Sequence, residues 1–191
     1  MNDLTRYQPQ FVAQKALFSF FGSSFRILGR DGSLQFFVKQ KAFKIKEEIT
    51  IFADEGQTQP MLRIRARSAL DFSATYDVVD AASGERIGAC RREGLKSILR
   101  DSWLILGDGD ATIAKLQEDS GAMALLRRFF PIIPQTFHVS VDGQDVGYIK
   151  QRFTFFRLTY DVDFSRSPLD PRLGVAITVL LLAIEGRQKG G

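Results

Sequence analysis

Five basic side chains form the strongest candidate for a binding surface in this sequence. They are Lys44, Lys46, Arg63, Arg65 and Arg67. The arginines alternate with apolar residues and the lysines flank an isoleucine, so each set lies on one face of a β-strand. A basic side chain held near an anionic membrane is worth about 1 kcal/mol. The pattern therefore predicts a site for anionic lipid headgroups. The alternative is an ordinary charged strand face that keeps the protein in solution.

The pairing of the two strands that carry these side chains is also predictable. If residues 43–52 and 61–67 form a hairpin, their apolar faces must coincide, because a shift of one residue turns every side chain to the other face. The residue numbers of opposed partners then sum to about 113, an odd value. This register predicts the opposed pairs Glu48–Arg65 and Lys46–Arg67. The acidic member would neutralise part of the basic surface.

A second basic group is a weaker candidate. It comprises Arg91, Arg92, Lys96 and Arg100, close to Trp103. An indole beside cations is typical of a lipid interface. The pattern favours the alternative, in which Trp103 is the core aromatic residue that begins its own hairpin.

The acidic residues near the C-terminus do not predict a calcium site. Asp161, Asp163, Ser165 and Asp170 lie close together in the sequence. Calcium needs six to eight oxygen ligands in a loop, whereas the first two residues alternate along a predicted strand. Asp170 has the position of a helix N-cap. We therefore expect no metal and no cofactor.

Few side chains are suited to catalysis. His138 is the only histidine and lies in a predicted strand, so a structural role is favoured and a histidine-rich metal site is excluded. Cys90 is the only cysteine, which excludes an internal disulfide. No glycine-rich phosphate loop is present. The sequence predicts a protein that is not an enzyme.

Composition and charge limit the remaining classes of function and partner. The chain has 26 basic and 22 acidic residues, and this small, mixed surplus does not indicate a nucleic-acid partner. No linker-like stretch interrupts residues 10–186, which predicts one domain over residues 1–191. The first residues carry no long apolar run, and a single cysteine permits a reducing compartment. We expect the protein in the cytoplasm, either free or at the periphery of a membrane.

The repeated element is a strand, a short Asp/Gly turn and a second strand. It occurs at residues 25–38, 76–88, 103–116 and 137–149. Asp-Gly between alternating runs is a strong hairpin signal, because a type I′ turn needs positive φ angles. Further strands are predicted at residues 11–17, 43–52, 61–67 and 155–164. About twelve short antiparallel strands should close into a barrel or split into a sandwich.

Two helices are predicted. One follows Ser120 over residues 121–130. The other begins at Asp170 and Pro171, includes an apolar run over residues 173–184 and ends at Gly186. A helix that is apolar on all sides lies in a protein core or spans a membrane. Twelve residues reach about 18 Å, against about 30 Å for a bilayer core, so the helix should lie inside the barrel. Its predicted core residues are Leu173, Ile177, Leu180, Leu181 and Ile184.

The chain resembles the tubby C-terminal-like superfamily, especially its LURP-one-related and phospholipid-scramblase-like branches. The resemblance rests on FVAQKALFSFFGSSFRILGRDG, on FFVKQKAFKIKEEITIF, on the hairpins at Tyr76 and Phe137 and on the closing apolar helix. It covers residues from about 10 to 187. It implies a mainly β fold: a closed antiparallel barrel of twelve strands around the C-terminal helix. Tubby proteins bind phosphoinositide headgroups, and scramblases act at bilayers with calcium. The palmitoylated cysteine cluster and proline-rich segment typical of scramblases are missing here.

Together these observations predict a non-catalytic module that binds an anionic lipid or membrane surface through the five basic side chains. A protein-interaction or scaffold domain without lipid affinity is the alternative. A carrier of a small apolar ligand is disfavoured, because the helix should fill the barrel.

Overall fold

The computed structural model describes residues 4–16, 23–40, 48–67, 74–93, 101–119, 134–152, 154 and 157–188. Alternation of apolar and polar residues within them produces strands with one buried and one exposed face. The strands are β1 (Gln10–Ala16), β2 (Ser23–Gly29), β3 (Leu34–Gln40), β4 (Ile49–Phe52), β5 (Pro60–Ala66), β6 (Thr75–Asp80), β7 (Arg86–Arg92), β8 (Ser102–Leu106), β9 (Thr112–Glu118), β10 (Thr136–Val141), β11 (Gln144–Arg152) and β12 (Arg157–Asp163). The helical elements are the 3₁₀ turns η1 (Leu4–Arg6) and η3 (Asp108–Asp110) and the helix α2 (Pro171–Gln188).

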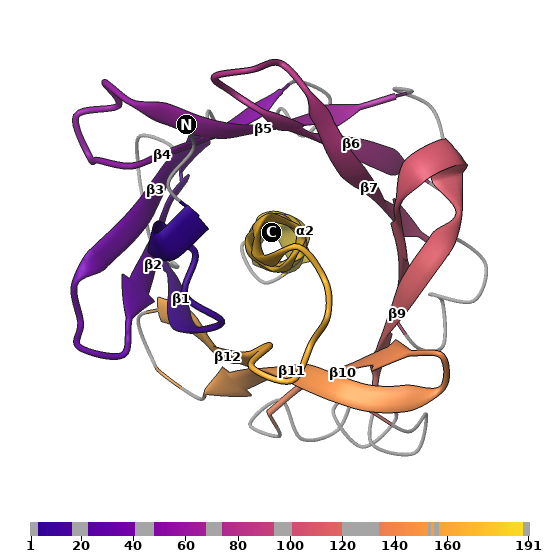
Figure 1. Ribbon diagram of the computed structural model, residues 1–191. Coiled ribbons are helices and arrows are strands. Elements are labelled where there is room, and N and C mark those ends of the chain that lie inside the picture. The colour runs from indigo at the N-terminus through magenta and orange to yellow at the C-terminus, as the bar shows by residue number, and fades with distance from the viewer. Residues whose placement is uncertain are drawn as a thin grey trace.

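The twelve described strands close into a barrel (Figure 1). Each strand pairs antiparallel with the next strand along the chain, and β1 pairs with β12 to complete the ring. Closure leaves no unpaired strand edge within the barrel. The inward faces carry large side chains, of which Trp103, Tyr160, Phe25, Phe36 and Phe137 are fully buried. The predicted mainly β fold, a closed antiparallel barrel, is confirmed.

The predicted Asp-Gly turns form the hairpin connections. In the β10–β11 turn both Asp142 and Gly143 have positive φ angles, of 50° and 78°, as a type I′ turn requires. The β8–β9 connection places Gly109 and Asp110 in the same left-handed region, with φ angles of 57° and 61°. That backbone conformation sets the direction of the Asp110 carboxylate, which matters for the surface described below.

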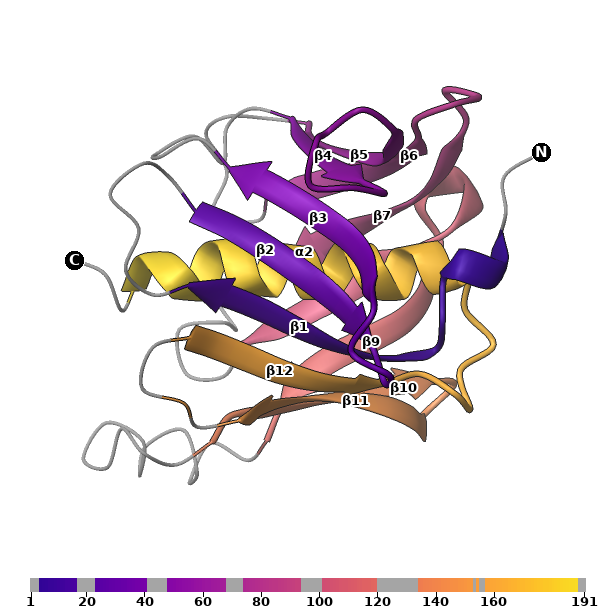
Figure 2. The ribbon, with the colours of Figure 1, turned by 90° about the vertical axis from the view of Figure 1, so that its left-hand side faces the viewer.

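Helix α2 lies along the inside of the barrel (Figure 2). Residues 173–183 are all buried, so the helix is surrounded by strands rather than by water. The predicted core residues Leu173, Ile177, Leu180 and Leu181 are at most 2% exposed. The side chain of Ile184 lies outside the described residues. No helix among the described residues is long and apolar enough to span a bilayer.

Polar contacts hold α2 at its beginning and at a point farther along the helix. Asp170 accepts a hydrogen bond of 2.9 Å from the Arg172 N–H, which confirms its predicted role as N-cap. The Arg172 guanidinium also pairs with buried Asp80, beside the β6–β7 turn, at 3.3 Å. Farther along, the Nζ of buried Lys15 donates to the Leu182 carbonyl at 3.3 Å. The helix is thus tied to both β6 and β1.

Two sequence predictions about helices have different outcomes. The predicted end of the last helix at Gly186 is wrong, because α2 continues to Gln188. A glycine permits a left-handed cap but does not require one, and Glu185, Arg187 and Gln188 are good helix formers. The helix predicted at 121–130 lies outside the described residues.

Candidate binding surfaces on the barrel wall

The hairpin predicted to carry the basic surface forms in the predicted register. Ile49 lies opposite Ile64 and Thr50 opposite Arg63, so the partner numbers sum to 113. Glu48 forms ion pairs with both Arg65 and Arg63, the latter at 3.5 Å. The expected partial neutralisation by Glu48 is therefore confirmed. Lys44 and Lys46 lie outside the described residues, so the Lys46–Arg67 pairing stays a prediction.

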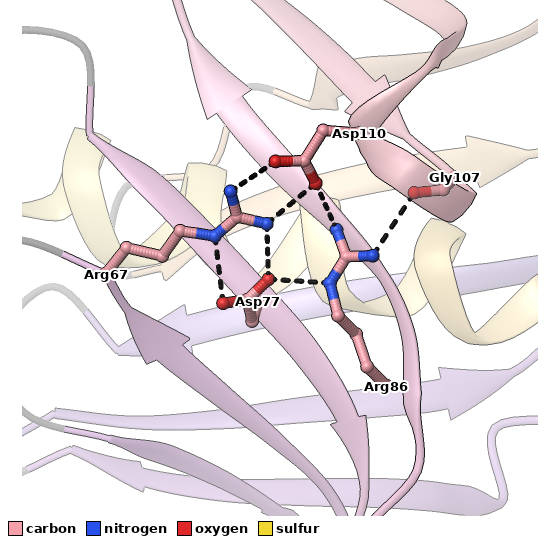
Figure 3. A network of polar contacts seen from close by, with 5 residues as sticks. All are labelled: Arg67, Asp77, Arg86, Gly107 and Asp110. Atoms are coloured by element: carbon pink, nitrogen blue, oxygen red, sulfur yellow. Dashed lines mark hydrogen bonds and ion pairs between the residues drawn. The ribbon is translucent and has the colours of Figure 1, made fainter.

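Arg67 belongs to a compact network of four charged side chains (Figure 3). Its Nε and one terminal nitrogen donate to the two oxygens of Asp77 at 2.9 and 2.8 Å, and it also pairs with Asp110. Arg86 donates to the same two carboxylates, at 2.8 Å to Asp77 and 2.6 Å to Asp110. Arg86 further donates to the Gly107 carbonyl at 3.2 Å. Two guanidinium groups and two carboxylates thus balance each other.

The ionisation of this network follows from its geometry. Hydrogen bonds from Arg67, with the charges of both arginines, lower the pKa of Asp110 to about 2. Burial opposes ionisation of Asp77, but hydrogen bonds from Arg67 and Arg86 outweigh it and lower its pKa. The two carboxylates in turn raise the pKa of Arg67. Asp77, Asp110 and Arg67 are therefore charged at neutral pH. The network sets two guanidinium groups against two carboxylates, so it has no net charge.

The outer face formed by these groups is called the arginine wall below. It comprises Glu48, Arg63, Arg65, Arg67, Asp77, Arg86 and Asp110. The side chains of Arg63 and Arg65 are 37% and 51% exposed and share one carboxylate. The surplus charge of the described wall therefore lies at Arg63 and Arg65 and not at Arg67.

A second surface lies where the two ends of the barrel sheet meet. A groove of about 520 Å³ runs over the outer faces of β1, β12 and β11 and is called the closure groove below. Strand register places Gln10, Asp163 and Tyr148 in one row, and Val12, Asp161 and Lys150 in the next. Gln10 and Asp163 are 153 residues apart in sequence, so local patterns do not reveal this surface. The one feature of the sequence that could have revealed it is the expected closure of the barrel, because closure pairs the first strand with the last.

The acidic residues of the closure groove are satisfied by neighbours within the chain. Asp163 accepts hydrogen bonds from Gln10 Nε2 at 2.8 Å and from the Ser165 N–H and Oγ at 2.9 and 2.6 Å. Burial opposes its ionisation, but these bonds prevail and lower its pKa. Asp161 accepts two hydrogen bonds from Arg152. The strand positions of Asp161 and Asp163 agree with the sequence interpretation.

The remaining basic side chains of the groove, Lys150 and Arg30, have fewer hydrogen-bond and ion-pair partners. Among the described residues, the side chain of exposed Lys150 has no hydrogen-bond or ion-pair partner. Arg30 donates to Gln10 Oε1 at 2.7 Å, and its charge contributes to the lowered pKa of Asp163, but it forms no direct ion pair within the described part of the chain. A guanidinium has five N–H donors, so most of those on Arg30 stay available. Sequence reasoning did not identify either residue.

The other residues considered for chemistry occupy separate environments. His138 lies on the exposed face of β10, with ring nitrogens 2.9 Å from both Asp119 and Asp145. Cys90 faces the core, where burial raises its pKa to about 12. Trp103 is fully buried, as the favoured alternative predicted. In the second basic group Arg92 pairs with Asp101 at 3.0 Å, while Lys96 and Arg100 lie outside the described residues. Over the described ranges, no group of three or more His, Cys, Asp or Glu side chains is arranged to hold a metal ion.

A closed antiparallel barrel around an apolar C-terminal helix, with charged surfaces on its outer wall, defines a tubby-like domain. The chain belongs to the LURP-one-related family, whose model matches residues 34–182. This family is part of the tubby-like superfamily, so the resemblance seen in the sequence is confirmed. No curated protein and no solved structure shows a significant match to the chain.

Proposed function

We propose that this chain is a non-catalytic binding module that attaches to anionic membrane surfaces through Arg63 and Arg65 on the arginine wall. The single observation that carries the proposal is the shared carboxylate: one Glu48 serves two exposed guanidinium groups. Among the described residues, two cations share this one anion, which leaves a local surplus of positive charge on the outside of the barrel. Because α2 occupies the barrel interior, ligands are expected on the outer wall rather than inside.

The size of the surplus sets the strength of attachment. Each basic side chain near an anionic surface contributes about 1 kcal/mol. Arg67 is left out of the binding set because Asp77 and Asp110 balance it together with Arg86. Lys44 and Lys46 precede β4 in the sequence and remain predicted members of the set. Two to four such charges predict a weak, reversible attachment that salt reduces, since the Debye length is only about 8 Å at 0.15 M.

Two further observations support a binding role over a catalytic one. The resemblance to tubby proteins, which bind phosphoinositide headgroups, favours a membrane ligand for a member of the same superfamily. In addition, His138 and Cys90 lie on opposite sides of the barrel wall, one exposed and one fully buried, and therefore do not form a nucleophile–base pair.

Co-sedimentation with liposomes tests the proposal. Purified protein is mixed with neutral or anionic vesicles at low and high salt. We expect binding to anionic vesicles at low salt and its loss at high salt. Arg63→Ala with Arg65→Ala should reduce the bound fraction at least fivefold.

Arg67→Ala supplies a matched control on the same face. It removes the same kind of side chain but one whose charge is already balanced, so it should change vesicle binding less than twofold. Binding that is equally sensitive to all three arginines, or no binding to any vesicle, would overturn the proposal.

A further inference from the structure

The alternating strand directions give the barrel two distinct ends. At the end where α2 begins, the connections are the turns 30–33, 53–59, 81–85, 107–111 and 142–143 and the segment 164–170 (Figure 2). This end is called the acidic end below. At the opposite end, called the basic end, the odd-numbered strands β1 to β11 finish and the even-numbered strands begin.

Exposed charges are divided between these ends by sign. Seven of the eight exposed acidic residues in the described part of the chain lie in a turn of the acidic end or within two residues of one: Asp31, Glu55, Glu85, Asp108, Asp110, Asp142 and Asp145. Of the nine exposed basic residues described, only Arg30 and Arg166 lie at that end. Six others lie within two residues of a strand terminus at the basic end: Lys39, Arg65, Arg67, Lys150, Arg152 and Arg157.

Ion pairs within the fold do not cancel this division at the basic end. Arg67 and Arg152 are balanced by carboxylates. The side chains of Lys39 and Arg157, in contrast, form no ion pair among the described residues. Arg157 donates to the uncharged Gln14 Oε1 at 3.2 Å. Positive charge therefore remains on β3 and β12, in addition to the surplus on β5.

The acidic end keeps unbalanced charge of the opposite sign. Over the described ranges, the carboxylates of Glu85, Asp108 and Asp142 form no ion pair. The carboxylate of Asp31 accepts hydrogen bonds from the Ser33 N–H and Oγ, which are uncharged donors. A negatively charged surface would therefore attract one end of the barrel and repel the other.

The sequence of the connections differs between the ends in the same direction. The segments that join strands at the basic end are 17–22, 41–48, 67–74, 93–101, 119–135 and 153–156, and they contain ten of the 17 phenylalanines. The connections of the acidic end contain one, Phe164, which is buried. Attachment to a lipid interface strengthens with apolar area as well as with positive charge, so this composition favours the basic end.

We propose that the barrel attaches to an anionic membrane by its basic end, with Lys39 and Arg157 contacting headgroups alongside Arg65 and the acidic end directed away from the membrane. This inference rests on the proposed function and adds to it an orientation and two contact residues. Helix α2 has 18 residues and is about 27 Å long, whereas the Debye length is about 8 Å at 0.15 M salt. Attachment by the basic end therefore keeps most of the acidic turns beyond the range of repulsion.

Fluorescent labels test the orientation directly. A nitrobenzoxadiazole group is attached to Ser24→Cys, at the start of β2 at the basic end, or to Gln144→Cys, beside the β10–β11 turn at the acidic end. Cys90 stays unlabelled because it is buried and its pKa is raised to about 12. With anionic vesicles at low salt, we expect the fluorescence of the first label to rise about twofold and that of the second to stay nearly constant.

Matched charge reversals test the two contact residues. Lys39→Glu and Arg157→Glu should each weaken binding to anionic vesicles at least tenfold. Arg166→Glu makes the same change in net charge at the acidic end and should weaken binding less than threefold. If Arg157→Glu does not fold, Arg157→Gln should still weaken binding about threefold, because it removes one charge and adds none.

The outcomes separate the orientation from membrane attachment itself. Vesicle binding with equal responses of the two labels, or with equal losses for Arg157→Glu and Arg166→Glu, would overturn the orientation and leave the proposed function standing. An increase confined to the label at Gln144→Cys would mean that the barrel attaches by the opposite end. Absence of binding to any vesicle would overturn the proposed function and the orientation together.

Discussion

The arginine wall and the closure groove use similar residues in different ways. In both, basic and acidic side chains lie together on the outer face of antiparallel strands. On the arginine wall, Arg67 and Arg86 are held by Asp77 and Asp110, and only the pair that shares Glu48 keeps surplus charge. In the groove, neutral donors bond to Asp163 and Arg152 pairs with Asp161, whereas the side chain of Lys150 has no partner among the described residues. A count of basic residues therefore does not give the charge that a ligand meets, because pairing within the fold decides it.

The largest expected effect comes from a substitution in the buried helix α2, which supports the strands of both surfaces. Leu181→Asp places a carboxylate at a fully buried position of α2, between the helix and the barrel. An unpaired buried charge costs several kcal/mol, a large part of the stability of a domain. We expect loss of soluble expression, measured by the soluble fraction and circular dichroism. A well-folded soluble variant would contradict the position of α2 inside the barrel, and therefore its role in supporting the strands of both surfaces.

The second prediction compares one carboxylate from each surface. Asp77→Ala leaves the guanidinium groups of Arg67 and Arg86 close together without the carboxylate that both contact, and should lower the free energy of unfolding by about 1–2 kcal/mol. Asp161→Ala breaks one exposed pair with Arg152 and should cost less than about 1 kcal/mol. Urea-induced unfolding measures both. Equal costs would mean that the network is no more than a set of separate surface pairs.

The third prediction concerns a substitution that removes negative charge from the arginine wall. Glu48→Gln frees Arg63 and Arg65 from their shared partner and should increase binding to anionic vesicles about fivefold, the equivalent of about 1 kcal/mol for one charge. Glu85→Gln, in the exposed β6–β7 turn, makes the same change in net charge and serves as the control. If both variants gain equally, total charge rather than the arginine wall controls attachment.

The smallest effect concerns the pH dependence of the arginine wall. The pKa of Asp110 is lowered from 3.8 to about 2 in the folded protein. The stabilising contribution of a group with a lowered pKa is complete above its unfolded value and is lost as the pH falls through its folded value. Asp110→Asn should therefore lower the melting temperature at pH 7, and the difference should shrink between about pH 4 and pH 2.

A control variant makes the pH measurement specific. Asp142→Asn replaces another turn aspartate, whose side chain has no hydrogen-bond or ion-pair partner in the described part of the chain and whose positive φ angle asparagine also tolerates. The pH-dependent change in melting temperature should be larger for Asp110→Asn than for this control. A difference for Asp110→Asn that persists unchanged at pH 2 would contradict the assigned role of the Arg67 and Arg86 contacts.

Much of the fold was predictable because its causes are local. The Asp142-Gly143 dipeptide specifies a tight turn through the φ angles it tolerates. The register of β4 against β5 follows from matching two apolar faces, since any one-residue shift exposes them. The place of α2 follows from a run of residues that is apolar on all sides and too short to span a bilayer. Each of these depends on neighbours in sequence or on a simple periodicity.

The available charge was decided by the tertiary structure. Arg67 and Asp110 are 43 residues apart, and they meet because the β8–β9 turn, with Asp110 in a left-handed conformation, lies beside β6 and β7. The closure groove exists because β1 pairs with β12, which brings Gln10 next to Asp163. The sequence by itself determined which faces are buried and where the chain turns, because burial and turn geometry act over a few residues. Which cations stay unpaired depends on contacts between distant strands, and only the closed barrel establishes those contacts.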